Sequence, residues 1–209
     1  DYVLVKTINQ YTKKPIAVIL AEKLLNSVFS KPYVPLGSEI DSSKEYSFEI
    51  VKTFKGEELV GFSYEQLMPL ARPFERPEAA FKIIHGDFVS TEDGTGIVHI
   101  APTFGADDAK VAADSGIPSM LVKNNSGELV PLVNLKGEFV EGLGFLSGKP
   151  VKDAYHKNED KGRKSVDVEI AISLKEENKA FKVEKYEHSY PHCWRTDKPV
   201  LYYPLDSWF

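Results

Sequence analysis

Alternating apolar and polar residues predict strands near the start of the chain. Residues 2–7 alternate in this way, and residues 15–20 form a second strand-like run. Within residues 21–29 apolar side chains recur at helical spacing, which predicts a short helix. Residues 46–54 fit either structure, because β-branched and aromatic residues favour a strand while three apolar positions also fit a helical face. Residues 57–62 are expected to be extended.

Later segments continue as short strands with few helices. The pattern predicts strands at 80–89, 96–100, 181–187 and 200–204, a hairpin formed by 120–122 and 128–130, and helices at 106–115 and 166–181. These elements do not follow a regular βαβ repeat. We therefore predict an α+β fold, in which a mainly antiparallel sheet closes into a β-barrel with a few peripheral helices.

Composition and charge narrow the class of protein. Hydrophobic residues make up 42% and charged residues 27% of the 209 residues, as in an ordinary globular protein. The net charge of −5 argues against a domain that holds duplex nucleic acid by itself. No apolar run approaches the roughly 18–20 residues that cross a membrane. The single cysteine, Cys193, suits a reducing compartment, so we expect a cytoplasmic protein.

Candidate chemistry gathers between Gly94 and Asp108. His99 stands at the end of the predicted strand 96–100, and Asp107 and Asp108 stand at the start of the predicted helix. A lone histidine is more often structural, although a strand end favours a site. One carboxylate at a helix start caps free N–H groups, and a second remains free to hold a cation such as an ammonium group. The pattern leaves open which aspartate does which.

Other motifs carry less chemistry. Turn chemistry explains Gly142 and Gly144, and neither a phosphate loop nor a serine-hydrolase elbow is present. Cys193 with His188 and His192 falls short of the four ligands that zinc needs. We therefore expect a structural cysteine and no metal.

Residues 94–108 read Gly-Thr-Gly-Ile-Val-His-Ile-Ala-Pro-Thr-Phe-Gly-Ala-Asp-Asp. This run closely resembles the signature of the editing domain of isoleucyl-tRNA synthetases, the connective polypeptide inserted into a class I catalytic core. The valyl and leucyl enzymes carry related versions. Residues 186–195 and the aromatic residues after them resemble the return of that insertion to the core. The resemblance implies an editing domain over residues 1–185, with its N-terminal part truncated, and a return segment over residues 186–209.

The resemblance also gives the residues roles. Asp108 would be the catalytic carboxylate that holds the α-ammonium of a misattached valine, and His99 would exclude the larger isoleucine side chain. Thr103, Phe104 and Gly105 would line the same pocket. Water, placed with help from the terminal ribose hydroxyl, would hydrolyse the ester without a covalent nucleophile.

The implied function is proofreading in translation by hydrolysis of misacylated valyl-tRNA(Ile). The implied partners are the tRNA(Ile) 3′ end carrying valine and the catalytic core of the same synthetase, with no membrane. No cofactor is expected in this domain. For the full-length enzyme the resemblance implies ATP and leaves zinc open. The alternative is a non-catalytic module that docks the tRNA end or braces the core.

Two departures from the family pattern matter. The threonine-rich segment that helps place the water normally lies just upstream of Asp1 and is absent here, so we expect weak or no activity from the isolated fragment. Thr196 stands where relatives often carry the second cysteine of a zinc pair.

Overall fold

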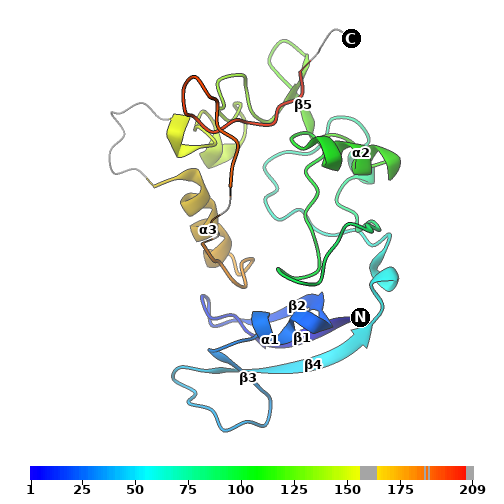
Figure 1. Cartoon of the computed structure of the whole chain (residues 1–209), viewed down its shortest axis with the longest axis vertical. Coiled ribbons are helices and arrows are strands. Elements are labelled where there is room, and N and C mark those ends of the chain that lie inside the picture. The colour runs from blue at the N-terminus through cyan, green and yellow to red at the C-terminus, as the bar shows by residue number, and fades with distance from the viewer. Residues whose placement is uncertain (156–163, 186, 188, 206–209) are drawn as a thin grey trace. The chain divides into compact units, whose positions relative to one another are not determined.

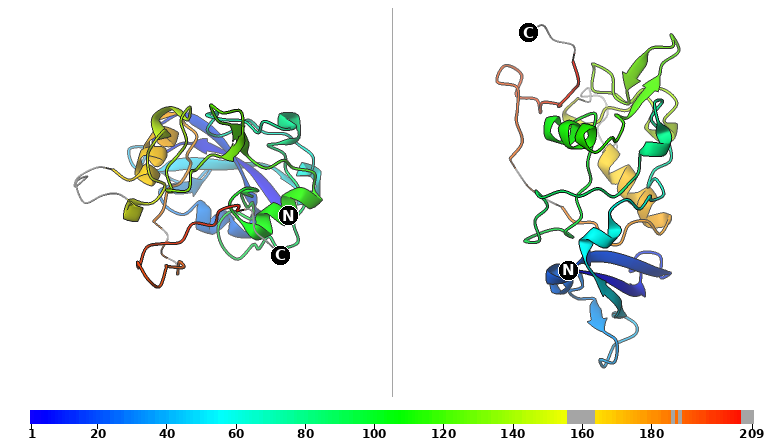
Figure 2. Two further views of the ribbon diagram at one scale, coloured as in Figure 1. Left: turned by 90° about the horizontal axis from the view of Figure 1, so that it is seen from above. Right: turned by 90° about the vertical axis from the view of Figure 1, so that its right-hand side faces the viewer.

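The computed structural model describes residues 1–155, 164–185, 187 and 189–205. The chain divides into two compact units (Figures 1 and 2). The first contains residues 1–62, 83–99 and 171–183, and the second contains residues 63–82, 100–170 and 184–209.

The first unit is built on a four-stranded sheet with the order β2-β1-β4-β3 (Figure 1). Its strand β1 (Tyr2–Ile8) pairs antiparallel with both β2 (Pro15–Ala21) and β4 (Tyr46–Phe54), and β3 (Tyr33–Pro35) pairs parallel with β4. The two predicted N-terminal strands are therefore confirmed. The ambiguous run 46–54 is a strand, because its backbone completes the ladder of β1.

The core of this unit lies on one face of the sheet. Val3, Val5 and Leu20 are fully buried, as the alternation in β1 predicts. The predicted short helix is confirmed as a 3₁₀ turn, η1 (Glu22–Leu24), followed by α1 (Leu25–Val28), and both contribute to this core. Phe29 then packs against Phe48 and Phe181, with ring centroids 4.9 and 5.0 Å away.

The second unit has less regular structure. It contains α2 (Ala106–Asp114) and an antiparallel hairpin of β5 (Leu121–Lys123) and β6 (Leu129–Pro131), drawn in green in Figure 2. Its core gathers Leu143, Leu146 and Val166, with partly buried neighbours such as Met68 and Leu70. The predicted helix 106–115 and the predicted hairpin are confirmed. The other short elements are η2 (Gly56–Leu59) in the first unit, and η3 (Pro77–Ala79), η4 (Gly144–Leu146) and η5 (Asp153–Tyr155) in the second.

The last helix is shorter than predicted. It runs as α3 (Val166–Glu176), beginning in the second unit and ending in the first, rather than continuing to residue 181. Asn178 adopts a left-handed conformation with φ 61°. The N–H groups of Lys179 and Ala180 donate to the Leu174 carbonyl. This left-handed stop closes the helix.

The predicted closed barrel is wrong. The described residues form only two small open sheets. The runs 80–89, 96–100 and 200–204, and the described part of 181–187, are not strands, and 57–62 begins as the turn η2. Apolar and β-branched residues form a strand only where another segment completes the ladder. In η2 the Glu58 carboxylate instead accepts the Lys55 N–H at 2.9 Å and starts a tight turn. None of the described helices is long and apolar enough to cross a bilayer.

Candidate functional site

The segment that leads to His99 is held against the sheet of the first unit. The Ala21 N–H donates to the Thr95 carbonyl at 2.8 Å, and the Tyr2 hydroxyl donates to the Gly96 carbonyl at 2.6 Å. Gly96 has a φ of 74°, and a Cβ there would lie 2.6 Å from the Ala21 Cβ. Only glycine meets both demands, so this contact fixes where the segment passes the sheet.

His99 is the last residue of that segment in the first unit, and its side chain is exposed. The residues before it, Ile97 and Val98, are 45% and 52% exposed. The predicted strand at 96–100 does not form. The hydrogen bonds from the sheet end at the carbonyls of Thr95 and Gly96, so Ile97 and Val98 have no ladder partner among the described residues. The other predicted site residues, Thr103 to Asp108, belong to the second unit.

In the second unit, Asp108 faces back toward the loop that precedes its own helix. Its Oδ2 accepts the Ala101 N–H at 2.8 Å, and the residue is half-buried. A Cβ on Gly105 would lie 3.2 Å from the Cβ, Cγ and Oδ2 atoms of Asp108. Glycine at position 105 therefore lets the carboxylate approach the loop.

The two aspartates differ from the expectation that one of them caps the helix while the other stays free. Gly105 is the N-cap of α2, and no side chain caps the helix there. Asp107 is exposed, whereas Asp108 is the aspartate that accepts a backbone N–H. Asp108 occupies the third helical position, from which a carboxylate can reach back to the preceding loop. Both carboxylates remain in the first turn, where the helix dipole favours negative charge.

Thr103 and Phe104 are fixed by contacts of different kinds. Thr103 is buried, and its Oγ1 accepts the Met120 N–H at 2.8 Å. The Phe104 ring meets the Tyr203 ring edge to face, with centroids 6.1 Å apart. The structure thus brings Thr103, Phe104, Gly105 and Asp108 together on one loop and helix start. The contact with Tyr203 had no signal in the sequence, since the two residues are far apart along the chain.

This arrangement offers one carboxylate in a fixed orientation. Among the described residues, no hydrogen bond is found to the second oxygen of Asp108, Oδ1. A carboxylate oriented through one oxygen can accept charge-assisted hydrogen bonds from an ammonium group through the other. The Ala101 N–H that orients it is a backbone group, so side-chain patterns could not reveal it.

Cys193 lies in a turn of the second unit. Hydrogen bonds from the Thr196 hydroxyl, and then from the backbone N–H groups of Arg195 and Thr196, lower the pKa of its thiol. His192 contacts the Tyr190 carbonyl through Nδ1 at 2.8 Å, and His188 lies outside the described residues. Across the part of the chain that the structure describes, no group of three or more potential metal ligands occurs.

Comparison with known proteins identifies relatives along the whole chain, although no family model matches it. The isoleucine–tRNA ligase of Cytophaga hutchinsonii is 57% identical over 221 residues, which cover 100% of this chain and 20% of that protein. Those of Bacteroides fragilis and Porphyromonas gingivalis are 48% and 44% identical, again covering 100% of this chain and 20% of each relative.

These matches place the chain among the aminoacyl-tRNA synthetases. More narrowly, it belongs with the isoleucine–tRNA ligases, as a segment that spans 20% of the length of these relatives.

Proposed function

We propose that this chain is the editing portion of an isoleucyl-tRNA synthetase and hydrolyses the aminoacyl ester of valyl-tRNA(Ile). The observation that carries the proposal is the Asp108 carboxylate, oriented by the Ala101 N–H at 2.8 Å. It is supported by homology of the whole chain to isoleucine–tRNA ligases. A carboxylate that is half-buried and oriented in this way suits an ammonium ligand, and an esterified amino acid carries one.

A separate hydrolytic site compensates for the limited discrimination between amino acids in the site that charges the tRNA. A hydrophobic pocket made for isoleucine rejects valine poorly. Valine is smaller by one methylene, so it fits the pocket and loses only the contacts of that group. The isoleucyl enzyme is itself the standard example of this limit and of a second site that destroys the wrong product. The partners proposed here are accordingly the tRNA(Ile) 3′ end that carries valine and the rest of the synthetase.

The proposed mechanism uses positioning rather than a covalent nucleophile. Asp108 pairs with the α-ammonium, Thr103, Phe104 and Gly105 line the amino-acid site, and His99 limits the size of the side chain. Water attacks the ester carbonyl, the bond to the ribose oxygen breaks, and that oxygen receives a proton. The products are free valine and tRNA with both terminal hydroxyls restored. Fixed orientation of ester and water supplies the rate.

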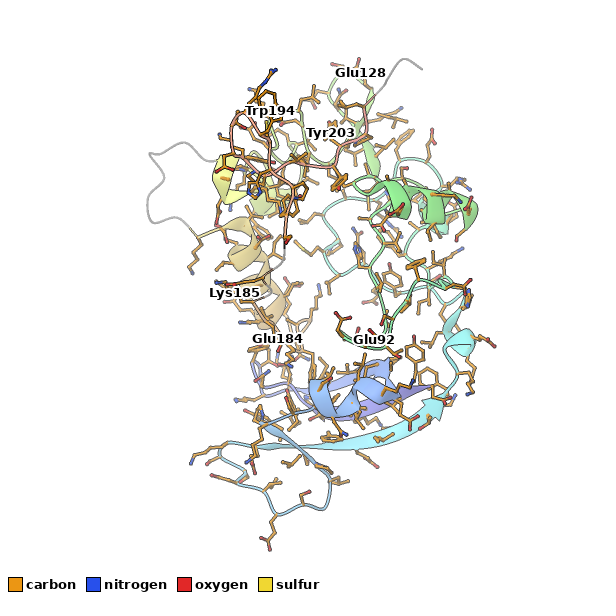
Figure 3. All side chains as sticks on the ribbon, viewed as in Figure 1. Glu92, Glu128, Glu184, Lys185, Trp194 and Tyr203 are labelled. Atoms are coloured by element: carbon orange, nitrogen blue, oxygen red, sulfur yellow. The ribbon has the colours of Figure 1, made fainter. Side chains whose placement is uncertain are left out.

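A second candidate function is a non-catalytic module that docks the tRNA end or braces the catalytic core. The observation in its favour is Trp194, labelled in Figure 3, which is 85% exposed. The Arg195 guanidinium lies over its ring, 4.6 Å from the centroid. Tryptophan and arginine are both enriched at protein interfaces relative to the rest of the surface.

Variants of the full-length ligase separate the two functions. Asp108→Ala should lower deacylation of valyl-tRNA(Ile) by about 100-fold or more, because the ammonium loses its counter-charge. Asp108→Asn keeps an acceptor for the Ala101 N–H and should lose nearly as much. Asp107→Ala, a matched change at the neighbouring exposed aspartate, should stay close to wild type. Wild-type deacylation by Asp108→Ala would favour the non-catalytic module.

A further inference from the structure

The second unit contains a hollow of about 490 Å³ beside the β5–β6 hairpin. The residues that line it include Val130 of β6, the turn residues Leu135 and Lys136, and Tyr203. Its size falls within the roughly 300–1,000 Å³ of small-molecule sites. Figure 3 shows Tyr203 on the C-terminal segment, near the hairpin that carries Glu128.

Two turns with the same construction border the hollow. In the first, Asn124 Oδ1 accepts the N–H groups of Ser126 and Glu128, and its amide donates to the Glu128 carboxylate. Ten residues later, Asn134 repeats these three contacts. Its partners are Lys136 and Glu138. Each asparagine thus stiffens its own turn and holds a nearby carboxylate.

Three side chains that line the hollow are available to a ligand, and each offers a different kind of contact. Within the part of the chain that the structure describes, the Lys136 ammonium has no ion-pair partner and the Tyr203 hydroxyl has no hydrogen bond. Leu135 is 79% exposed. The hollow therefore combines an aromatic ring, an exposed aliphatic side chain and an unpaired cation.

The hollow also adjoins the candidate site through a direct contact. The Tyr203 ring that lines it meets the Phe104 ring edge to face, with centroids 6.1 Å apart. Phe104 lies on the loop that the Ala101 N–H joins to Asp108. A chain-like ligand whose end reaches Asp108 can thus continue past Phe104 to Tyr203.

We propose that this hollow holds an unpaired nucleotide of the RNA strand that leads to the aminoacylated ribose. The base stacks on Tyr203 beside Leu135, and Lys136 pairs with a phosphate. An aromatic platform with a nearby cation is the usual means of binding single-stranded nucleic acid. This inference rests on the proposed editing function and assigns residues to the strand that carries the ester.

Deacylation kinetics of the full-length ligase on valyl-tRNA(Ile) test the inference. Lys136→Ala should raise KM about fivefold and leave kcat within about twofold, and it should reduce the dependence of log KM on log salt by about 0.7, the value of one phosphate contact on a single strand. Tyr203→Leu, which keeps an apolar side chain against Phe104, should raise KM by about fivefold or more. Lys44→Ala, at an exposed lysine of the first unit, should match wild type in KM and salt dependence.

A second measurement keeps this inference separate from the proposed function. A photoreactive base placed in the unpaired 3′ strand of the tRNA should crosslink to residues 129–140 and 200–205 of the wild-type ligase. Wild-type KM and salt dependence in both variants, or crosslinks confined to other peptides, would overturn the nucleotide site. Neither result would alter the loss of deacylation expected for Asp108→Ala, and only unchanged deacylation in that variant would overturn the editing function.

Discussion

Gly105 and Asp108 form a small positioning unit at the start of α2. The glycine leaves room for a carboxylate that lies against the loop, and the Ala101 N–H holds that carboxylate at 2.8 Å. A larger residue at position 105 would change the position of Asp108 without changing its charge. The contribution of orientation to the proposed reaction can therefore be measured apart from the contribution of charge.

We predict that Gly105→Ala lowers kcat/KM for valyl-tRNA(Ile) deacylation by the full-length ligase about tenfold. The new Cβ would lie 3.2 Å from the Asp108 carboxylate, which must then move by a few tenths of an ångström. A displacement of about 1 Å in a catalytic group costs about 100-fold, so a smaller shift should cost less. Isoleucine activation by the same enzyme should not change. An unaltered deacylation rate would show that the orientation of Asp108 is not limiting.

The prediction for His99 is of a different kind, because its proposed role depends on the volume of its side chain rather than on charge. In the full-length ligase, His99→Ala should raise hydrolysis of correctly charged isoleucyl-tRNA(Ile) by about tenfold or more, since one added methylene is discriminated by about 10–200-fold in a tight pocket. Hydrolysis of the valyl ester should change little. His85→Ala, at another exposed histidine of the first unit, serves as the control. If the isoleucyl ester stayed resistant to hydrolysis in His99→Ala, His99 would not be the residue that excludes isoleucine.

Much of the candidate site could be located from the sequence, but its internal contacts could not. The pair Asp107-Asp108 marked a helix start, which the structure confirms at Ala106. Which aspartate binds the backbone depends on how the loop before the helix folds back to present the Ala101 N–H, a property of backbone path rather than residue type. The edge contact between Phe104 and Tyr203 likewise depends on the path of a distant segment.

At the scale of elements, sequence patterns succeeded where local signals and tertiary partners agree. Strand β1 alternates and lies between two antiparallel neighbours, so Val3 and Val5 are buried as expected. Residues 96–100 have the composition of a strand, yet the hydrogen bonds from the sheet reach only the carbonyls of Thr95 and Gly96 at the start of this run. The predicted barrel therefore failed because composition cannot show which segments supply each other with ladder partners.

The sheet of the first unit should depend strongly on its buried face. We predict that Leu20→Ala, at a fully buried position of β2, lowers the free energy of unfolding of this unit by about 2–5 kcal/mol. Leu36→Ala, at a residue that is 63% exposed, should change it by less than about 0.5 kcal/mol. Hydrogen exchange of the β1 amides in increasing urea reports the unfolding of this sheet. Equal effects of the two substitutions would contradict the assignment of the core to this face.

At the scale of the whole molecule, the net charge limits how strongly the chain alone can bind a nucleic acid. The net charge is −5, with 31 acidic and 26 basic residues. A polyanion such as tRNA is not attracted at long range by a surface of the same sign. The proposed nucleotide contact uses one lysine, Lys136, so few phosphates are neutralised. In the proposed function, the body of the tRNA is therefore held by the remainder of the synthetase.

We predict that the 209-residue chain alone binds uncharged tRNA(Ile) weakly and with little dependence on salt. Each phosphate neutralised contributes about −0.7 to −0.9 to the slope of log affinity against log salt, so one or two contacts give a slope of about −0.7 to −1.8. Fluorescence anisotropy of labelled tRNA between about 50 and about 200 mM salt would measure this slope for the chain and for the full-length ligase. A slope of the chain as steep as that of the ligase would mean that this segment itself holds the tRNA body. A shallow slope in the chain and a steep one in the ligase would show that the segment receives only the tip of the tRNA, in agreement with Lys136 as the one lysine among the described residues that line the hollow.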